Sequence, residues 1–194
     1  MSNPEKRIPL IKAFRNHVKD IPIENIISID ETSIDTHIEN NKGWSKRGVK
    51  LTSIKTYKRI RYTVISSVGF NKVIHNEIIK GSCNGDIFLD FIKDVIKKLP
   101  KTTNWGFILD NARIHHYKKL KEYLNKVDNV KIIYNVPYSP ESNPIEKVFN
   151  EIKNTLKNIP INEGNIIKEI NRSFLCIKKE NLNNYFKKSI NFYK

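Results

Sequence analysis

The order in which the apolar segments change their spacing most constrains the fold of this chain. Short apolar runs typical of strands cover residues 25–30, 51–59, 61–70 and 72–80. Later runs of this kind cover residues 105–110 and 129–135, and they alternate with helical spacing over 85–99, over 115–127 and from 144. Antiparallel strands followed by alternating strands and helices predict an α/β domain. We expect a mixed sheet, an antiparallel meander followed by parallel strands, with helices on both faces.

The two ends of the chain have helical patterns of their own. Apolar residues repeat at helical spacing over residues 7–20 and again from residues 162 and 178. No internal repeat or linker-like run divides the sequence. We therefore expect one domain over residues 1–194, with an N-terminal helical linker at 1–22 and a C-terminal helical tail at 160–194.

The charge of the chain is strongly positive. Lys and Arg total 35 against 20 Asp and Glu, which gives a formal net charge of +15. Such a surface attracts polyanions, of which nucleic acid is the commonest. The alternative is a compositional bias, because the sequence is rich in Ile, Lys and Asn, as an AT-rich genome would produce.

The sequence also argues against membrane insertion and secretion. No run approaches the roughly 20 apolar residues of a spanning helix, and no apolar segment typical of a signal peptide follows the first residues. The two cysteines, Cys83 and Cys176, have no metal-ligand spacing. We expect a protein of the cytoplasm, nucleoid or nucleus that is not secreted.

Three acidic residues stand at predicted element ends: Asp30 and Asp110 after apolar strands, and Glu146 in the first turn of a helix. Singly, each has an ordinary explanation, namely a strand end, an Asx-turn, and a capping box with Asn143. Together, three carboxylates on rigid elements suit hard divalent cations such as Mg²⁺ or Mn²⁺. Their charge is about enough for two ions, as in two-metal phosphoryl-transfer sites.

Three sequence blocks carry a family resemblance. They read IDET at residues 29–32, LDNARIH at 109–115 and PYSPESNPIE at 137–146, and 35 residues lie between Asp110 and Glu146. These blocks and this spacing resemble the DDE transposases of the mariner superfamily, closest to its bacterial insertion-sequence branch. The segment GWSKRG at 43–48 is also similar to that branch, and the resemblance extends from about residue 7 to about residue 160.

The resemblance implies an RNase H-like fold and a catalytic triad of metal ligands at Asp30, Asp110 and Glu146. Family members cut double-stranded DNA at terminal inverted repeats and join the 3′ ends to target DNA. A full-length member carries an N-terminal helix-turn-helix region, for which we find no room before Asp30. We therefore expect a catalytic domain only, whose recognition region is encoded separately or lost. A homodimer is expected only by analogy.

Other polar residues near these blocks receive weaker assignments. Glu31 should point away from Asp30 across its strand, which favours a supporting role. We expect His115 and His116 to be mostly solvated surface, although one of them could begin a helix or contact a phosphate. Asn111 and Asn143 could brace the acidic segments. Trp44, Lys46 and Arg47 are candidates for DNA contact, and Tyr134 and Tyr138 for packing.

Two other functions stay open at this point. One is a non-catalytic DNA-binding remnant or regulator of an intact transposase, which would keep the basic surface without competent cleavage. The other is a general RNase H-like nuclease that acts on other structured nucleic acid. The block at residues 137–146 argues against the latter, because it belongs to the transposase resemblance rather than to carboxylate chemistry in general.

Overall fold

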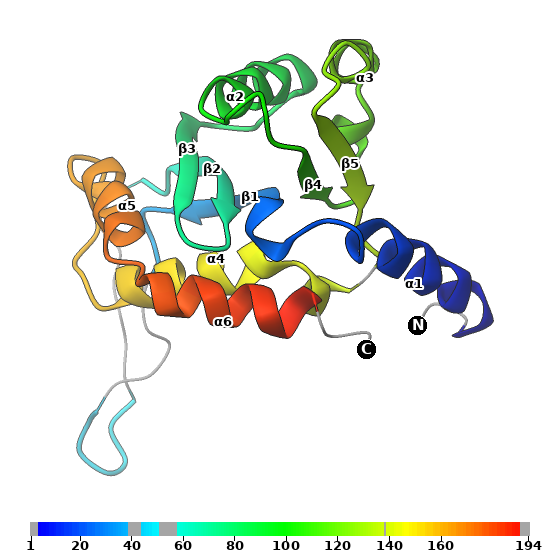
Figure 1. Ribbon diagram of the computed structural model, residues 1–194. Helices are drawn as coiled ribbons and strands as arrows, with labels where there is room; N and C mark the ends of the chain where they lie inside the picture. Colours follow the sequence, from blue (N-terminus) through cyan, green and yellow to red (C-terminus); the bar gives the residue numbers. More distant parts are fainter. Residues whose placement is uncertain (1–3, 39–43, 51–57, 138, 191–194) are drawn as a thin grey trace.

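A five-stranded mixed sheet forms the centre of the molecule (Figure 1). The computed structural model describes residues 4–38, 44–50, 58–137 and 139–190. The sheet order is β3-β2-β1-β4-β5, antiparallel among β1, β2 and β3 and parallel from β1 through β4 to β5. The strands are β1 (Ile26–Asp35), β2 (Arg61–Gly69), β3 (Val73–Lys80), β4 (Trp105–Leu109) and β5 (Val130–Tyr134). The prediction of a meander followed by parallel strands is confirmed.

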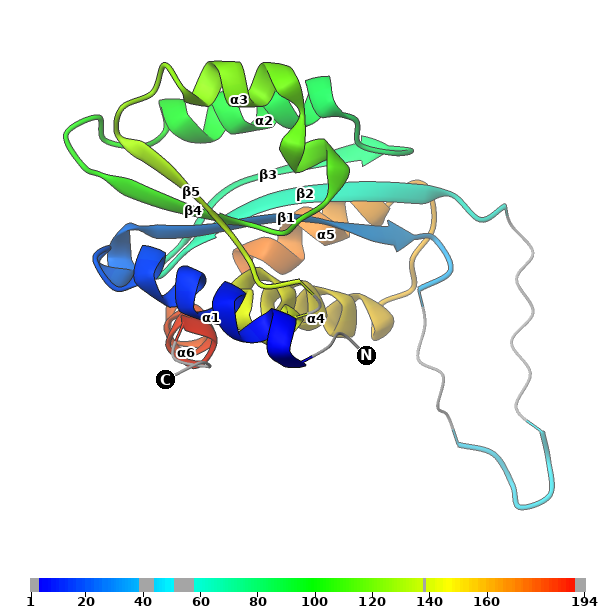
Figure 2. The same cartoon turned by 90° about the vertical axis from the view of Figure 1, so that its right-hand side faces the viewer.

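Helices cover both faces of this sheet, as expected (Figure 2). One face carries α2 (Gly85–Lys97) and α3 (Lys118–Leu124). The opposite face carries α1 (Pro4–Val18), α4 (Pro144–Lys157), α5 (Ile166–Leu175) and α6 (Lys179–Ile190). The result is a three-layer arrangement with β1 in the middle of the sheet.

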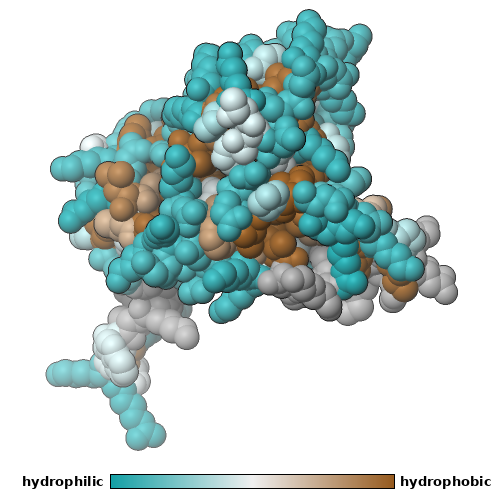
Figure 3. All heavy atoms as spheres, viewed as in Figure 1, coloured by the Kyte–Doolittle hydropathy of each residue, from teal (hydrophilic) through white to brown (hydrophobic). Residues whose placement is uncertain are grey.

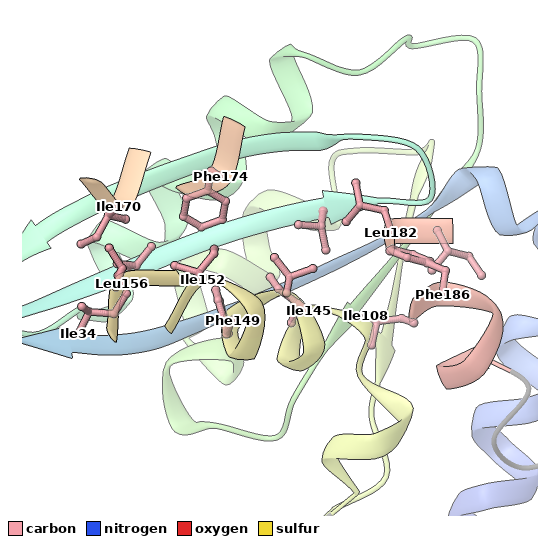
Figure 4. Close-up of a cluster of buried hydrophobic side chains, with 14 of the residues drawn as sticks. Ile34, Ile108, Ile145, Phe149, Ile152, Leu156, Ile170, Phe174, Leu182 and Phe186 are labelled. Carbon is pink, nitrogen blue, oxygen red and sulfur yellow. The ribbon is translucent and has the colours of Figure 1, made fainter. Parts of the chain in front are cut away.

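The alternation of side chains along β1 divides the core in two. Ile26 and Ile34 point to the α4 face, where they pack in a cluster with residues of α4, α5 and α6 (Figure 4). Ile27 and Ile29 point to the other face and pack against α2 and α3. Because the strand period is two, Ser28 and Asp30 lie on the same face as Ile26, and Glu31 lies on the same face as Ile27 and Ile29.

The sequence-based prediction that the first strand ends at residue 30 is wrong. β1 continues beyond Asp30 to Asp35, because β2 pairs with it from Ile27 opposite Gly69 to Asp35 opposite Arg61. Asp30 is therefore a mid-strand residue. The predicted strand at 51–59 lies mostly outside the described residues, and residues 58–60 form no strand.

The predicted helix over residues 115–127 is also different in the structure. A 3₁₀ turn at Arg113–His116 is followed by α3, and between them Tyr117 has the extended angles φ −57° and ψ 132°. This break allows residues 113–116 to turn back toward the end of β4. His115, which contacts Asp110, lies in that turn.

The surface is mainly hydrophilic in the view of Figure 3. Hydrophobic side chains show beside α5 and in a groove between α1 and α6, which is lined in part by Phe14, Val18 and Ile190. Over the described ranges, none of the helices combines the length and the apolar character needed to cross a bilayer.

Candidate active site

The strand register brings the first two acidic residues to the same place. β4 pairs in parallel with β1 only from Ile26 to Ser28, which lies opposite Ile108. Asp30 lies two residues further along β1, and Asp110 directly follows the last residue of β4. Since β4 ends at Leu109, the second half of β1 lacks this neighbour, and a hollow opens beside Asp30 at the carboxyl end of β4. Ligand sites of open α/β sheets form at such ends.

Asp30 is a buried carboxylate held by neutral donors. Its residue is 7% exposed, and its Oδ2 accepts a hydrogen bond from Asn143 Nδ2 at 2.9 Å. The Glu31 backbone N–H donates to its Oδ1 at 2.8 Å. Burial, followed by the nearby charges of Asp110 and Glu31, raises the pKa of Asp30 to about 8. Asp30 is therefore mostly protonated at neutral pH, because its surroundings do not compensate a negative charge there.

Asp110 is held differently, by an ionic partner. Its Oδ1 lies 2.7 Å from His115 Nδ1 and accepts the Ala112 backbone N–H at 2.8 Å, which makes an Asx-turn. The hydrogen bond with His115 lowers the pKa of Asp110 against the opposing effect of burial. The Asp110 side chain is 46% exposed toward the hollow.

His115 joins Asp110 to Glu31. Its Nε2 lies 3.1 Å from Glu31 Oε2, and its ring packs on Phe88 of α2 with 4.5 Å between the ring centroids. Burial favours the neutral imidazole, but the hydrogen bonds with Asp110 and Glu31 outweigh it and raise the pKa of His115 to about 10. The histidine is 1% exposed, so the expectation that it is solvated surface is wrong. His116 is exposed and stacks on Tyr134.

Asn143 stands directly before α4 and connects it to β1. Its amide donates to Asp30, and its Oδ1 accepts from the Ser28 hydroxyl. Ser28 in turn accepts the Ile145 backbone N–H at 3.4 Å. The Asn143 side chain makes no capping bond to its own helix, so the capping box with Glu146 does not form. The amide serves the buried carboxylate instead.

The loop before α4 is held to the end of β4 by Asn135. The Asn135 backbone N–H donates to Leu109 O at 2.8 Å, and its side chain bonds Ser139 and Ser142. Asn111 Nδ2 donates to the Asn135 carbonyl at 2.7 Å. These contacts fix the position from which α4 starts, and with it Glu146. Tyr138 lies outside the described residues.

One cavity of about 460 Å³ brings the three acids together. Asp30, Asp110 and the half-buried Glu146 all line it, with Asn111 and Asn143 beside them. Within the described ranges, however, no three His, Cys, Asp or Glu side chains are grouped closely enough to hold a metal ion as they stand. The metal-ligand role of Asp30, Asp110 and Glu146 thus stays a prediction.

Sequence reasoning missed the residues that connect these acids across the fold. His115 was available as a signal, because it stands five residues after Asp110 in the same block. Ser28 and Asn135 carry no local signal, because their contacts depend on α4 and β4 meeting β1. Glu31 points away from Asp30 as expected, and there it contacts His115.

Comparisons with known proteins agree with this architecture. A family profile described as "DDE superfamily endonuclease" matches residues 25–167. A Mos1 transposase paired-end complex with the left transposon end matches the whole chain with a TM-score of 0.82 and 16% identity, over 61% of that transposase chain. The catalytic domain of Mos1 mariner transposase matches with a TM-score of 0.76 and 15% identity, over 92% of its length.

A further match is the Mos1 catalytic domain in a structure with Raltegravir and Mg, with a TM-score of 0.76 and 15% identity, over 94% of that chain. No curated protein matches the sequence. The chain spans about three fifths of the longer transposase chains that it resembles. With a family profile over most of its length and this shared architecture, the chain belongs to the DDE superfamily endonucleases and has the RNase H-like fold of the mariner transposase catalytic domain.

Proposed function

We propose that this chain is the catalytic domain of a transposase, which cleaves DNA strands at transposon ends and transfers them to target DNA. Asp30, Asp110 and Glu146 would hold Mg²⁺ or Mn²⁺, with two ions in the complete site. The observation that carries the proposal is the shared cavity, lined by all three acids that the sequence blocks single out. In this proposal residues 1–194 are one catalytic domain, with a linker at 1–22 and a tail at 160–194.

The donor set suits such ions. Carboxylate and amide oxygens line the cavity, and these are the ligands that Mg²⁺ and Mn²⁺ prefer. Asp30 is buried beside other acids and its pKa is raised to about 8, so a cation bound there would replace the proton and stabilise the ionised carboxylate. Among the similar structures are Mos1 paired-end complexes with Mg and with Mn.

Bound divalent ions supply a more acidic attacking water or 3′-hydroxyl and stabilise the leaving oxygen. The chain's own residues orient the ligands. Asn143 directs the Asp30 carboxylate, and His115 fixes Asp110 by one oxygen, Oδ1. The α4 N-terminus sets the direction of Glu146. Such supporting partners typically contribute 10–100-fold to metal affinity or activity.

The partners follow from this activity. The substrate would be double-stranded DNA, as terminal inverted repeats and as target, and the net charge of +15 favours such a polyanion. A homodimer and a separate helix-turn-helix subunit or domain belong to the same proposal. The protein would act where DNA is, in the cytoplasm, nucleoid or nucleus.

The test is cleavage of a plasmid that carries the inverted repeats flanking the gene, with Mg²⁺ or Mn²⁺. Asp30→Asn, Asp110→Asn and Glu146→Gln should each reduce nicking by more than about 100-fold, beyond the effect of losing a supporting partner. Glu122→Gln on the exposed side of α3 is the matched control and should cleave normally. Full cleavage by one of the three variants would remove that residue from the site. Salt-sensitive binding without any nicking by the wild type would instead favour a DNA-binding remnant.

A further inference from the structure

A second cavity lies further along β1, beyond the candidate active site. It has a volume of about 280 Å³ and lies where β1 ends beside the last turns of α4. The side chains that give it its charge are Asp35, His37, Arg59, Lys153 and Lys157. Neither the three acids nor the residues that hold them line this cavity.

The cavity has a surplus of positive charge. Arg59 pairs with Asp35 through Nη2 at 2.7 Å and Nε at 3.0 Å from the same Oδ2. This pair balances the one carboxylate among the lining residues. Lys153 and Lys157 then add two positive charges beside it, both from α4 and both half-buried. Such a setting attracts a polyanion backbone.

Lys153 and Lys157 lie on the same stripe of α4 as Glu146. Seven and eleven residues separate them from Glu146, which is close to two and three turns at 3.6 residues per turn. All three side chains therefore leave the helix in nearly the same direction. At 1.5 Å per residue, the lysines stand roughly 10 and 16 Å from Glu146 along the helix axis.

β1 runs alongside this stripe from one cavity to the other. Figure 2 shows β1 and α4 extending toward the same end of the molecule, and in Figure 4 Ile34 of β1 lies beside Leu156 near the end of α4. Asp30 lines the first cavity, and Ser33 and Asp35 line the second. The two cavities thus follow each other along one strand and one helix.

We propose that this second cavity is a binding site for the phosphodiester backbone of the DNA strand that reacts at the carboxylates, held by Lys153 and Lys157. The inference rests on the proposed function and adds the path of the substrate. One strand of B-DNA carries a phosphate every 3.4 Å along its axis. The two lysines therefore meet phosphates roughly three and five nucleotides from the reacting one.

The experiment measures binding and cleavage separately. The affinity of the full chain for a mixed-sequence DNA duplex is determined by fluorescence anisotropy between 50 and 200 mM salt. The test variant is Lys153→Gln with Lys157→Gln. The charge-matched control is Lys101→Gln with Lys126→Gln, two exposed lysines near the start of β4 and the approach to β5, at the opposite end of these strands from Asp110. Lys153→Arg with Lys157→Arg keeps the charge.

Two lost phosphate contacts should reduce the slope of log K against log salt by about 1.8. Over a fourfold change in salt, the wild type then loses about 12-fold more affinity than the test variant. The arginine variant should keep the wild-type slope, and the control should change it less than the test variant does. At low salt, the test variant should cleave DNA less efficiently because its KM is raised, while its kcat is largely retained.

Two results overturn the proposal. An unchanged slope in the glutamine variant, while the wild type binds and cleaves DNA, refutes the lysine site and leaves the proposed function intact. A wild-type chain that nicks plasmid DNA but binds it with no dependence on salt also refutes the lysine site, whereas a wild-type chain that nicks at no Mg²⁺ or Mn²⁺ concentration refutes the proposed function. Plasmid nicking assayed in the same preparations separates these failures, because loss of nicking in Asp30→Asn reports on the carboxylates and not on the lysines.

Discussion

The two faces of β1 support their acids in different ways. On the α4 face, Asp30 is buried and receives hydrogen bonds from an uncharged amide and a backbone N–H. On the α2 face, Glu31 contacts the buried ring of His115, which also holds Asp110 after the end of β4. The pKa of Asp30 is raised, whereas that of Asp110 is lowered. His115 thus balances the charges of Glu31 and Asp110, whereas the uncharged donors at Asp30 leave it mostly protonated at neutral pH until an external cation binds.

Removal of the internal cation should have the largest effect on stability. In His115→Ala, two carboxylates lose their common partner and the space against Phe88 is left empty. We expect a loss of about 2–4 kcal/mol in the free energy of unfolding at pH 7. Urea denaturation measures it, with His116→Ala, an exposed neighbour, as the control. Equal stability of the two variants would mean that the ionic face contributes little.

Addition of an external cation should have the next largest effect, and it acts at the cavity that Asp30, Asp110 and Glu146 line. At a Mg²⁺ or Mn²⁺ concentration 100 times the dissociation constant, the free energy of unfolding should rise by about 2.7 kcal/mol. Chelation should reverse the gain. Thermal denaturation with and without metal measures it, and Asp30→Asn should lose most of it. A gain of equal size in Asp30→Asn would show that the ion binds without this carboxylate.

The charge at Asp30 should also destabilise the metal-free protein as the pH rises. Its pKa is 3.8 in the unfolded state and about 8 in the folded state, so the folded state binds the proton more tightly and loses stability between these values. Asp30→Asn lacks this loss, and a flipped Asn143 amide can accept from the new amide. Relative to the wild type, the variant should gain a few kcal/mol between pH 4 and pH 8 in chelator. If the free energy of unfolding changes with pH in the same way in both proteins, the raised pKa of Asp30 is contradicted.

The sequence singled out the three acids but not the residues that hold them. Strand periodicity and the block spacing pointed to Asp30, Asp110 and Glu146, because each stands in a locally recognisable setting. The end of β1 was predicted wrongly at Asp30, since its second half is stabilised by pairing with β2 rather than by its own composition. Local patterns indicate that a strand exists, but long-range pairing decides its length.

The supporting contacts depend on long-range packing in the same way. Asn143 and Asp30 are 113 residues apart, and His115 and Glu31 are 84 apart. The sequence around Asn143 indicated a helix cap, which is its usual role before a helix. The structure uses its amide for a buried carboxylate instead, because an unpaired carboxylate in the core costs more than a missing cap. No local pattern reveals that competition.

The smallest expected effect belongs to Glu31→Gln, which retains a hydrogen-bond acceptor for His115 and removes only a charge. Since the Glu31 side chain is 21% exposed, we expect a loss of about 0.5–1.5 kcal/mol at pH 7. The pKa of His115 is about 10 in the folded protein and 6.5 in the unfolded chain. The contribution of protonated His115 to the free energy of unfolding is therefore complete below pH 6.5 and disappears as the pH approaches 10. In Glu31→Gln that decline should begin at lower pH, because one carboxylate fewer holds the proton. Titration of the His115 ring by NMR measures the shift directly, with the exposed His116 as an internal reference. An unchanged His115 pKa would mean that Asp110 alone keeps the His115 ring protonated. The ionic contribution of the α2 face would then come from one ion pair, His115 with Asp110.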